Sequence, residues 1–111
     1  MALAPISAQS KEYLKIPVSA RDNSGIINPT GDPVAFAFLA PESPPVGGTT
    51  WTSGDWETAT GFGTGDPVYK ARCLIGPGGA VALAAGSYDV WVRVGHNTEV
   101  VMRKAGSIRI I

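Results

Sequence analysis

The clearest structural signal in the sequence is residues 88–95, which read YDVWVRVG. Tyr88 and the valines at 90, 92 and 94 share one face of an extended chain, because successive side chains of a strand point to opposite sides. Trp91 and Arg93 fall on the other face. The valine face makes the better core, so the pattern predicts a strand that buries its valines and turns Trp91 to the outer surface of a sheet.

Similar short runs recur along the chain, and glycine and proline separate them, with 14 Gly and 9 Pro in 111 residues. About seven short strands with a turn signal roughly every 8–12 residues predict an all-β sandwich or barrel. Pro17 lacks a main-chain N–H, so the strand that contains it is expected at a sheet edge. The predicted strands are 12–20, 34–40, 51–56, 68–75, 80–84, 88–95 and 99–103, with a glycine break at 105–106 before a last apolar run.

A glycine turn stands directly before the strand at 88–95, in the run LAAGSY of residues 83–88. In immunoglobulin-like sandwiches a tyrosine at this place donates its hydroxyl hydrogen bond to the backbone a few residues upstream, the tyrosine corner. Leu83, Gly86 and Tyr88 therefore predict a structural tyrosine corner. This feature favours an immunoglobulin-like β-sandwich among the all-β folds.

The chain has the length of one domain, and its charge is balanced, with nine basic and nine acidic side chains. Nucleic acid binding normally needs a basic patch, so we expect no nucleic acid partner. No apolar run approaches the roughly 20 residues that span a bilayer, so we expect no membrane contact. Charged residues are only 16% of the chain. This fraction lies below the usual quarter or so and favours a component of an assembly. Residues 1–10 lack a basic region followed by an apolar core, so we expect the chain to be made in the cytoplasm.

The domain is predicted to occupy residues 12–111, and residues 1–11 are predicted to form an extended N-terminal arm. Residues 1–10 are rich in Ala, Pro and Ser, with scattered apolar positions such as Ile6. Such a segment offers little apolar surface to bury, and chain ends fray unless something holds them. We therefore expect the arm to leave its own domain free and to order on a neighbouring subunit, with Ile6 at that interface.

The chemistry-bearing residues do not assemble into a recognisable catalytic or metal motif. His96 is the one histidine and Cys73 the one cysteine, and they belong to different predicted elements. Zinc and acid–base sites need partners for such residues. Asp55, Glu57 and Asp66 are close in sequence but lie in glycine-rich segments, whereas glycosidase carboxylates need fixed separations. We expect no enzyme, no cofactor and no metal, and we expect Cys73 to be a buried apolar side chain.

The three tryptophans are the better candidates for function. Trp51 and Trp56 flank a short loop, and Trp91 stands beside Arg93 on the outward face of its strand. Tryptophan and arginine are enriched at protein interfaces, and indole rings also stack on sugars. Trp56 has a second interpretation as a core side chain between the two sheets. These four residues and Ile6 are the predicted interface, and the loops at 41–50 and 58–66 are expected to contribute to it.

Several stretches of the sequence resemble one family. They are residues 10–18, residues 69–79 (YKARCLIGPGG), the motif formed by Leu83, Gly86 and residues 88–94, and Glu99 and Val100 with the last apolar run. These stretches resemble small immunoglobulin-like virion proteins of tailed bacteriophages, particularly those of actinobacterial hosts. Residues 51–66 lie outside the resemblance.

The resemblance implies a non-enzymatic structural protein of the virion, located in the head or in the head–tail connector. Its expected partners are other virion proteins, either major capsid or connector subunits, with many copies of the chain in each particle. An alternative is a carbohydrate-binding or host-surface-binding module that uses Trp51, Trp56 and Trp91 as stacking platforms. An enzyme is the third hypothesis, after these two.

Overall fold

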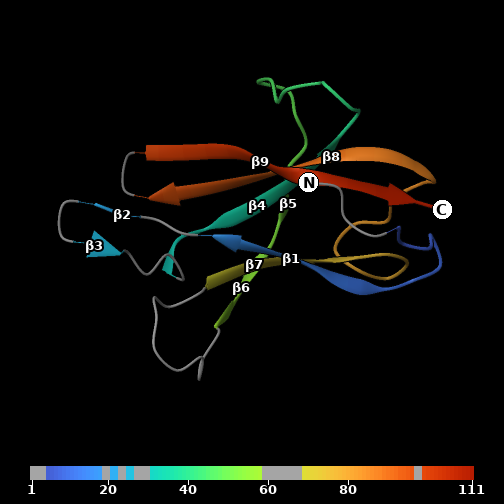
Figure 1. The fold of residues 1–111 in the computed structure, drawn as a ribbon, viewed down its shortest axis with the longest axis horizontal. Coiled ribbons are helices and arrows are strands. Elements are labelled where there is room, and N and C mark those ends of the chain that lie inside the picture. The colour runs from blue at the N-terminus through green and yellow to red at the C-terminus, as the bar shows by residue number, and fades with distance from the viewer. Residues whose placement is uncertain (1–4, 19–20, 23–24, 27–30, 59–68, 97–98) are drawn as a thin grey trace.

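The computed structural model describes residues 5–18, 21–22, 25–26, 31–58, 69–96 and 99–111. Within these residues the regular elements are strands (Figure 1). They are β1 (Glu12–Val18), β2 (Arg21–Asp22), β3 (Gly25–Ile26), β4 (Val34–Leu39), β5 (Thr52–Ser53), β6 (Asp55–Thr58), β7 (Tyr69–Ile75), β8 (Gly86–His96) and β9 (Glu99–Ile110).

Two antiparallel sheets face each other as a β-sandwich, which confirms the predicted all-β class. In the described residues one sheet has the order β1-β7-β6 and the other the order β5-β4-β8-β9, seven strands in all, and β2 and β3 form a separate hairpin. Figure 1 shows the two sheets as an upper and a lower layer. β1 lies at the edge of its sheet, as Pro17 predicted, because an edge strand tolerates a missing N–H.

The core between the sheets follows the predicted alternation. Val90 and Val92 of β8 are buried together with Phe36 of β4, whereas Trp91 lies on the opposite face of the sheet. Cys73 of β7 is also buried, and burial raises the pKa of its thiol to about 11. This side chain is therefore a neutral part of the core, as predicted. The remaining members of the core cluster are Leu14, Val34, Ala71, Ile75, Ile108 and Ile110.

Two predicted details are wrong. Residues 80–84 form no strand, and Val81 makes only a single bridge, to Ile75. The chain folds back there, so the main-chain bonds are local ones: Gly76 N–H donates to the carbonyl of Val81, and Ala80 N–H donates to that of Leu74. The glycine break at 105–106 is also absent, since β9 continues to Ile110. A register shift opposite the Val90–Trp91 step absorbs one residue as a β-bulge, which lets the strand continue.

The N-terminal segment corrects a third expectation. Residues 5–10 pack on their own domain instead of leaving it free. Ile6 forms a parallel bridge with Ile110; its N–H donates to the carbonyl of Arg109, and its carbonyl accepts from Ile111 N–H, both at 2.9 Å. Ile6 and Ala8 pack against the core cluster. The alternation of these two apolar side chains lets the segment bury surface locally. Residues 1–4 of the predicted arm lie outside the described residues.

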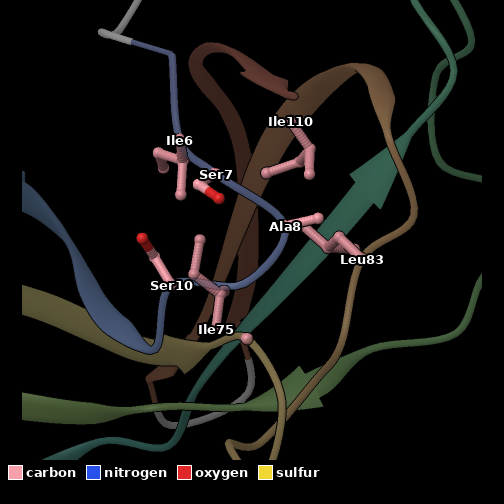
Figure 2. Close-up of a pocket in the computed structure, with 8 residues that line it drawn as sticks. Ile6, Ser7, Ala8, Ser10, Ile75, Leu83 and Ile110 are labelled. Carbon is pink, nitrogen blue, oxygen red and sulfur yellow. The ribbon is translucent and has the colours of Figure 1, made fainter.

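Figure 2 shows the place where this segment meets the sandwich. A cavity of about 10 Å³ remains there, which is at the lower limit for one water molecule. Gly76 has a φ of +117°, and a Cβ at this position would overlap the carbonyl oxygen of Ser10. Glycine at this position therefore allows the N-terminal segment to pass close to the end of β7. The cavity is lined by Ile6, Ser7, Ala8, Ser10, Ile75, Gly76, Leu83 and Ile110.

The predicted corner residues lie together at the start of β8. The Tyr88 hydroxyl donates to the carbonyl oxygen of Ala84 at 2.7 Å, which is the contact that defines a tyrosine corner. Gly86 has a φ of +148°, in the region that favours glycine. Leu83 packs against the core cluster. The three residues together fix how the chain enters β8.

Candidate interaction face

The candidate site is the face of the β5-β4-β8-β9 sheet that points away from the other sheet, which we call the outer face. Strand alternation carries Asp89, Trp91 and Arg93 of β8 to this face, since Val90 and Val92 enter the core. Directly paired residues of antiparallel strands share a face. The outer face therefore also includes Ala35, Ala37 and Leu39 on β4 and Met102, Lys104 and Ser107 on β9.

Trp91 lies at the centre of the outer face, between Ala37 on one side and Lys104 on the other. Ala37 is only 1% exposed although it faces away from the core. A small side chain at this position leaves room for a neighbouring indole. Trp91 itself is partly buried, and its Nε1 is buried without an acceptor among the described residues. Trp91 is therefore more enclosed than an isolated surface tryptophan.

Arg93 and Trp51 form a second contact on the same face. The guanidinium carbon of Arg93 lies 4.6 Å from the centre of the Trp51 ring, a cation–π contact. Beside it is a shallow, open groove of about 300 Å³. The groove combines one cation with small and apolar walls, which suits a partner that inserts an apolar or acidic side chain. It is lined by Pro33, Val34, Ala35, Ser53, Arg93, Gly95 and Val100.

Asp89 anchors the loop between β4 and β5 at one end of the outer face. This carboxylate is 4% exposed and accepts hydrogen bonds from Glu42 N–H at 2.9 Å and from the Ser107 hydroxyl at 3.0 Å. Lys104 Nζ lies 3.3 Å away. Glu42 N–H, followed by Ser107 and Lys104, lowers the pKa of Asp89, although burial acts in the opposite direction. In Figure 1 this loop rises above the four-stranded sheet, on the side away from β1, β7 and β6.

An apolar strip on β9 continues from this face to the edge of the sheet. Val100, Val101 and Met102 are 59%, 38% and 40% exposed. Val100 and Met102 lie on the outer face, and Val101 on the inner one, because β9 alternates like any other strand. Sequence reasoning did not include this strip. The available signal was three consecutive apolar residues, which cannot all face one core.

The structure gathers some of the predicted interface residues and separates others. Trp51, Trp91 and Arg93 share the outer face. Trp56 lies on β6 in the other sheet, where it packs against the core cluster and its Nε1 donates to the carbonyl of Asp32 at 2.9 Å. Ile6 is partly covered by its own domain. Trp56 therefore follows its second interpretation, as a core side chain.

Two of the carboxylates considered for catalysis or metal binding make ion pairs. Asp55 binds Arg72 at 2.8 Å, and Glu57 binds Lys15 at 3.0 Å. This contact with Lys15, above all, lowers the pKa of Glu57. Asp66 and the side chain of His96 lie outside the part of the chain that is described. In the described part, no three His, Cys, Asp or Glu side chains come together as a metal site.

Comparison of the chain with protein-family models, with curated proteins and with solved structures gives no match. The residues that the structure describes also contain no helix long and apolar enough to cross a membrane. The site therefore has to be interpreted from its own geometry.

Proposed function

We propose that this chain is an immunoglobulin-like module that binds protein and serves as a non-enzymatic structural component of a tailed-bacteriophage virion. In this proposal the outer face attaches many copies of the module to capsid or connector subunits and reinforces or connects them. The observation that carries the proposal is the grouping of Trp91, Trp51 and Arg93 on one sheet face beside a groove.

The strand order supports the immunoglobulin-like part of the proposal. In such folds one sheet contains strands A, B, E and D, and the other contains C, F and G. Here β1-β7-β6 follows the order B-E-D, and β4-β8-β9 follows the order C-F-G. β5, next to β4, corresponds to the additional C′ strand of variable-type domains. The hydrogen bond from Tyr88 to Ala84 stands at the start of the strand that corresponds to F.

The composition of the outer face supports protein as the partner. Trp and Arg are the residue types that contribute most often to binding energy at protein interfaces, and they act near the centre of the contact. Trp91 is central, and Lys104 and Ser107 lie beside it towards β9. A sugar platform needs an open ring face, whereas Arg93 already lies over the ring of Trp51. The location in a virion rests on the resemblance of residues 69–79 and 83–94.

The test is attachment to the products of the genes that flank the gene for this chain. The tagged chain is co-expressed with those capsid and connector candidates, and assembled particles are separated on a density gradient. We expect the chain to travel with the particles. Trp91→Ala and Arg93→Ala should lower its occupancy, since truncation of a central interface tryptophan costs about 2 kcal/mol or more. Lys11→Ala, an exposed change away from the outer face, should not.

Circular dichroism of each variant distinguishes loss of attachment from loss of folding. Arg93→Ala keeps the test valid if Trp91→Ala unfolds. Absence of the chain from every assembled particle, together with glycan-array binding that Trp51→Ala abolishes, would contradict the proposal and support the carbohydrate-binding alternative.

A further inference from the structure

In the part of the chain that the structure describes, the outer edge of β9 is open along its N-terminal half. β9 is the last strand of the four-stranded sheet, and β8 occupies its other side. The N-terminal segment approaches this edge at the far end, where Ile6 meets Ile110. Among the described residues no strand pairs with the edge between Glu99 and Lys104. An edge of this kind presents unpaired main-chain groups that can bind another strand.

One hydrogen bond fixes which main-chain groups point outward. Gly95 N–H donates to the carbonyl of Pro33 at 3.1 Å, on the β4 side of β8. Gly95 is therefore not hydrogen-bonded to Val100, its paired residue on β9. Because bonded and non-bonded pairs alternate along an antiparallel ladder, Val100, Met102 and Lys104 direct their N–H and C=O groups to the open edge.

This edge combines exposed apolar side chains with the cations Arg103 and Lys104. Arg103 Nη1 donates to the carbonyl of Met102 at 2.9 Å, a bond that an incoming strand has to replace. Natural proteins protect an edge with prolines, with charges that point inward or with a covering segment. Here Val100, Val101 and Met102 are 59%, 38% and 40% exposed. Consecutive exposed apolar residues on an unpaired edge make this part of β9 a place where another strand can bind.

We propose that this strand is β9 of a second copy, paired antiparallel about a two-fold axis at Val101. Residues that lie opposite each other in antiparallel strands point to the same face of the sheet, and side chains alternate between faces along a strand. When β9 pairs with its own copy, two opposite residues therefore have numbers that are both odd or both even. With the axis at Val101, Val101 lies opposite its own counterpart, and Val100 lies opposite Met102 of the second copy. Val100 and Met102 then exchange main-chain hydrogen bonds on both sides of the axis.

Charge selects this register over the next one. With the axis at Val101, Glu99 of each copy lies opposite Arg103 of the other, so each dimer gains two cross-strand pairs of opposite charge. With the axis at Met102, Val100 lies opposite Lys104 and Val101 opposite Arg103, which places apolar residues against cations. The contact is isologous and closes on itself, as in most homodimers.

The dimer would join the two four-stranded sheets into one continuous sheet, with both outer faces on the same side. Two copies of Trp91 and Arg93 would then face one direction, and a repeating lattice could bind both at once. Such two-point attachment raises the apparent affinity without any new contact to the lattice. The dimer itself is independent of what the outer face binds.

Sedimentation velocity of the full chain over a range of concentrations tests the dimer. We expect a monomer–dimer equilibrium that Val101→Lys shifts to monomer, because two lysines would face each other at the axis. Val46→Lys makes the same change at a loop residue that is 70% exposed and should leave the equilibrium unchanged. A parent chain that stays monomeric at all concentrations, or an equal loss in both variants, would overturn the proposal.

Disulfide formation tests the register. Val101→Cys places two thiols at a non-hydrogen-bonded pair across the axis, with Cα atoms about 4.5 Å apart, a separation that a disulfide can bridge. We expect Val101→Cys to form a covalent dimer on mild oxidation faster than Met102→Cys or Val46→Cys. Cys73 is buried and common to all three variants. Faster cross-linking of Met102→Cys, or equal rates in the three variants, would overturn the Val101-centred pairing.

Discussion

The two halves of β9 both contain apolar residues but have different surroundings. Both halves pair with β8 and both carry apolar side chains. In the C-terminal half, Ile108 and Ile110 are buried against the other sheet, and the N-terminal segment covers the strand edge at Ile110. In the N-terminal half, Val100 and Met102 are exposed, and in the described residues no strand pairs with their outer edge.

This difference shows that apolar content alone does not define a core. A β-strand is stabilised by the layer beneath it and by its neighbours at both edges, and only the C-terminal half of β9 has both. The N-terminal half extends the sheet and exposes apolar surface, which a soluble protein keeps mainly where a partner covers it. The two halves of β9 should therefore differ in their contribution to the free energy of unfolding as much as they do in structure.

The largest expected difference is between Ile108→Ala and Val101→Ala. Ile108 is 2% exposed, so its truncation leaves a cavity and should lower the free energy of unfolding by about 2–5 kcal/mol. Val101 is exposed, and its truncation should change stability by no more than about 0.5 kcal/mol. Urea unfolding at concentrations where the chain is monomeric measures both. Similar losses in the two variants would show that the halves are equally part of the core.

Gly76→Ala should release the N-terminal segment from the C-terminal half of β9, whose edge the segment covers. The added Cβ would overlap the Ser10 carbonyl, and the φ of +117° strains any other residue. We expect a loss of about 1–3 kcal/mol. Hydrogen exchange at the amides of Ile6 and Ala8 should become faster, because these amides donate to β9 and to the residue after it. Gly47→Ala, where a Cβ meets no atom within 4 Å, is the matched control. Unchanged exchange in Gly76→Ala would contradict this account of the segment.

Tyr88→Phe should lower the stability of the fold at the turn that leads into β8, opposite the C-terminal half of β9. The change removes the hydrogen bond to Ala84 and keeps the ring. Because Ala84 is exposed, water can replace the hydroxyl, and the expected cost is about 0.5–1.5 kcal/mol by denaturant midpoint. Tyr13→Phe, which keeps its ring next to Arg72, should cost less. An unchanged midpoint for Tyr88→Phe would mean that the corner contributes nothing to stability.

The sequence predicted what depends on local alternation. The valine face of β8, the outward position of Trp91 and the edge position of the strand with Pro17 all follow from side-chain periodicity and from the missing N–H of proline. The sandwich followed from the number and spacing of such runs. These features need no knowledge of distant contacts.

The sequence did not predict what depends on distant segments. The segment at Ile6 docks because β9 leaves its edge open at Ile110, and no pattern within residues 5–10 contains that information. The burial of Asp89 depends on the β4–β5 loop, where Glu42 adopts a φ of +65°, which is uncommon for a residue other than glycine. Residues 105–106 resemble a strand break, but the bulge absorbs Ala105, and Gly106 pairs with Val90 of β8.

The smallest expected effect is a change of stability with pH at Asp89, which connects the β4–β5 loop on the outer face to β9. Asp89 accepts from Glu42 N–H in the β4–β5 loop and from Ser107 of β9, and these contacts lower the pKa of its carboxyl group. Because this pKa is lower in the folded state than in the unfolded state, the carboxylate stabilises the fold above its ordinary pKa. That contribution is lost as the pH falls through the folded-state pKa, below about pH 4.

Asp89→Asn should therefore remove part of the acid sensitivity. Asn keeps an acceptor oxygen for Glu42 N–H but carries no charge. The unfolding free energy of the variant should therefore be lower than that of the parent at neutral pH, and it should fall less steeply below about pH 4. Glu57→Gln is the matched control, because the Lys15 contact lowers the pKa of Glu57 away from the outer face. Amide exchange of Glu42 in acid then separates the two sites: the parent and Glu57→Gln should lose protection of this amide as Asp89 is protonated, whereas Asp89→Asn should show no such step. Parallel acid curves for the parent and Asp89→Asn would mean that the β4–β5 loop is held on the outer face by packing and not by this carboxylate.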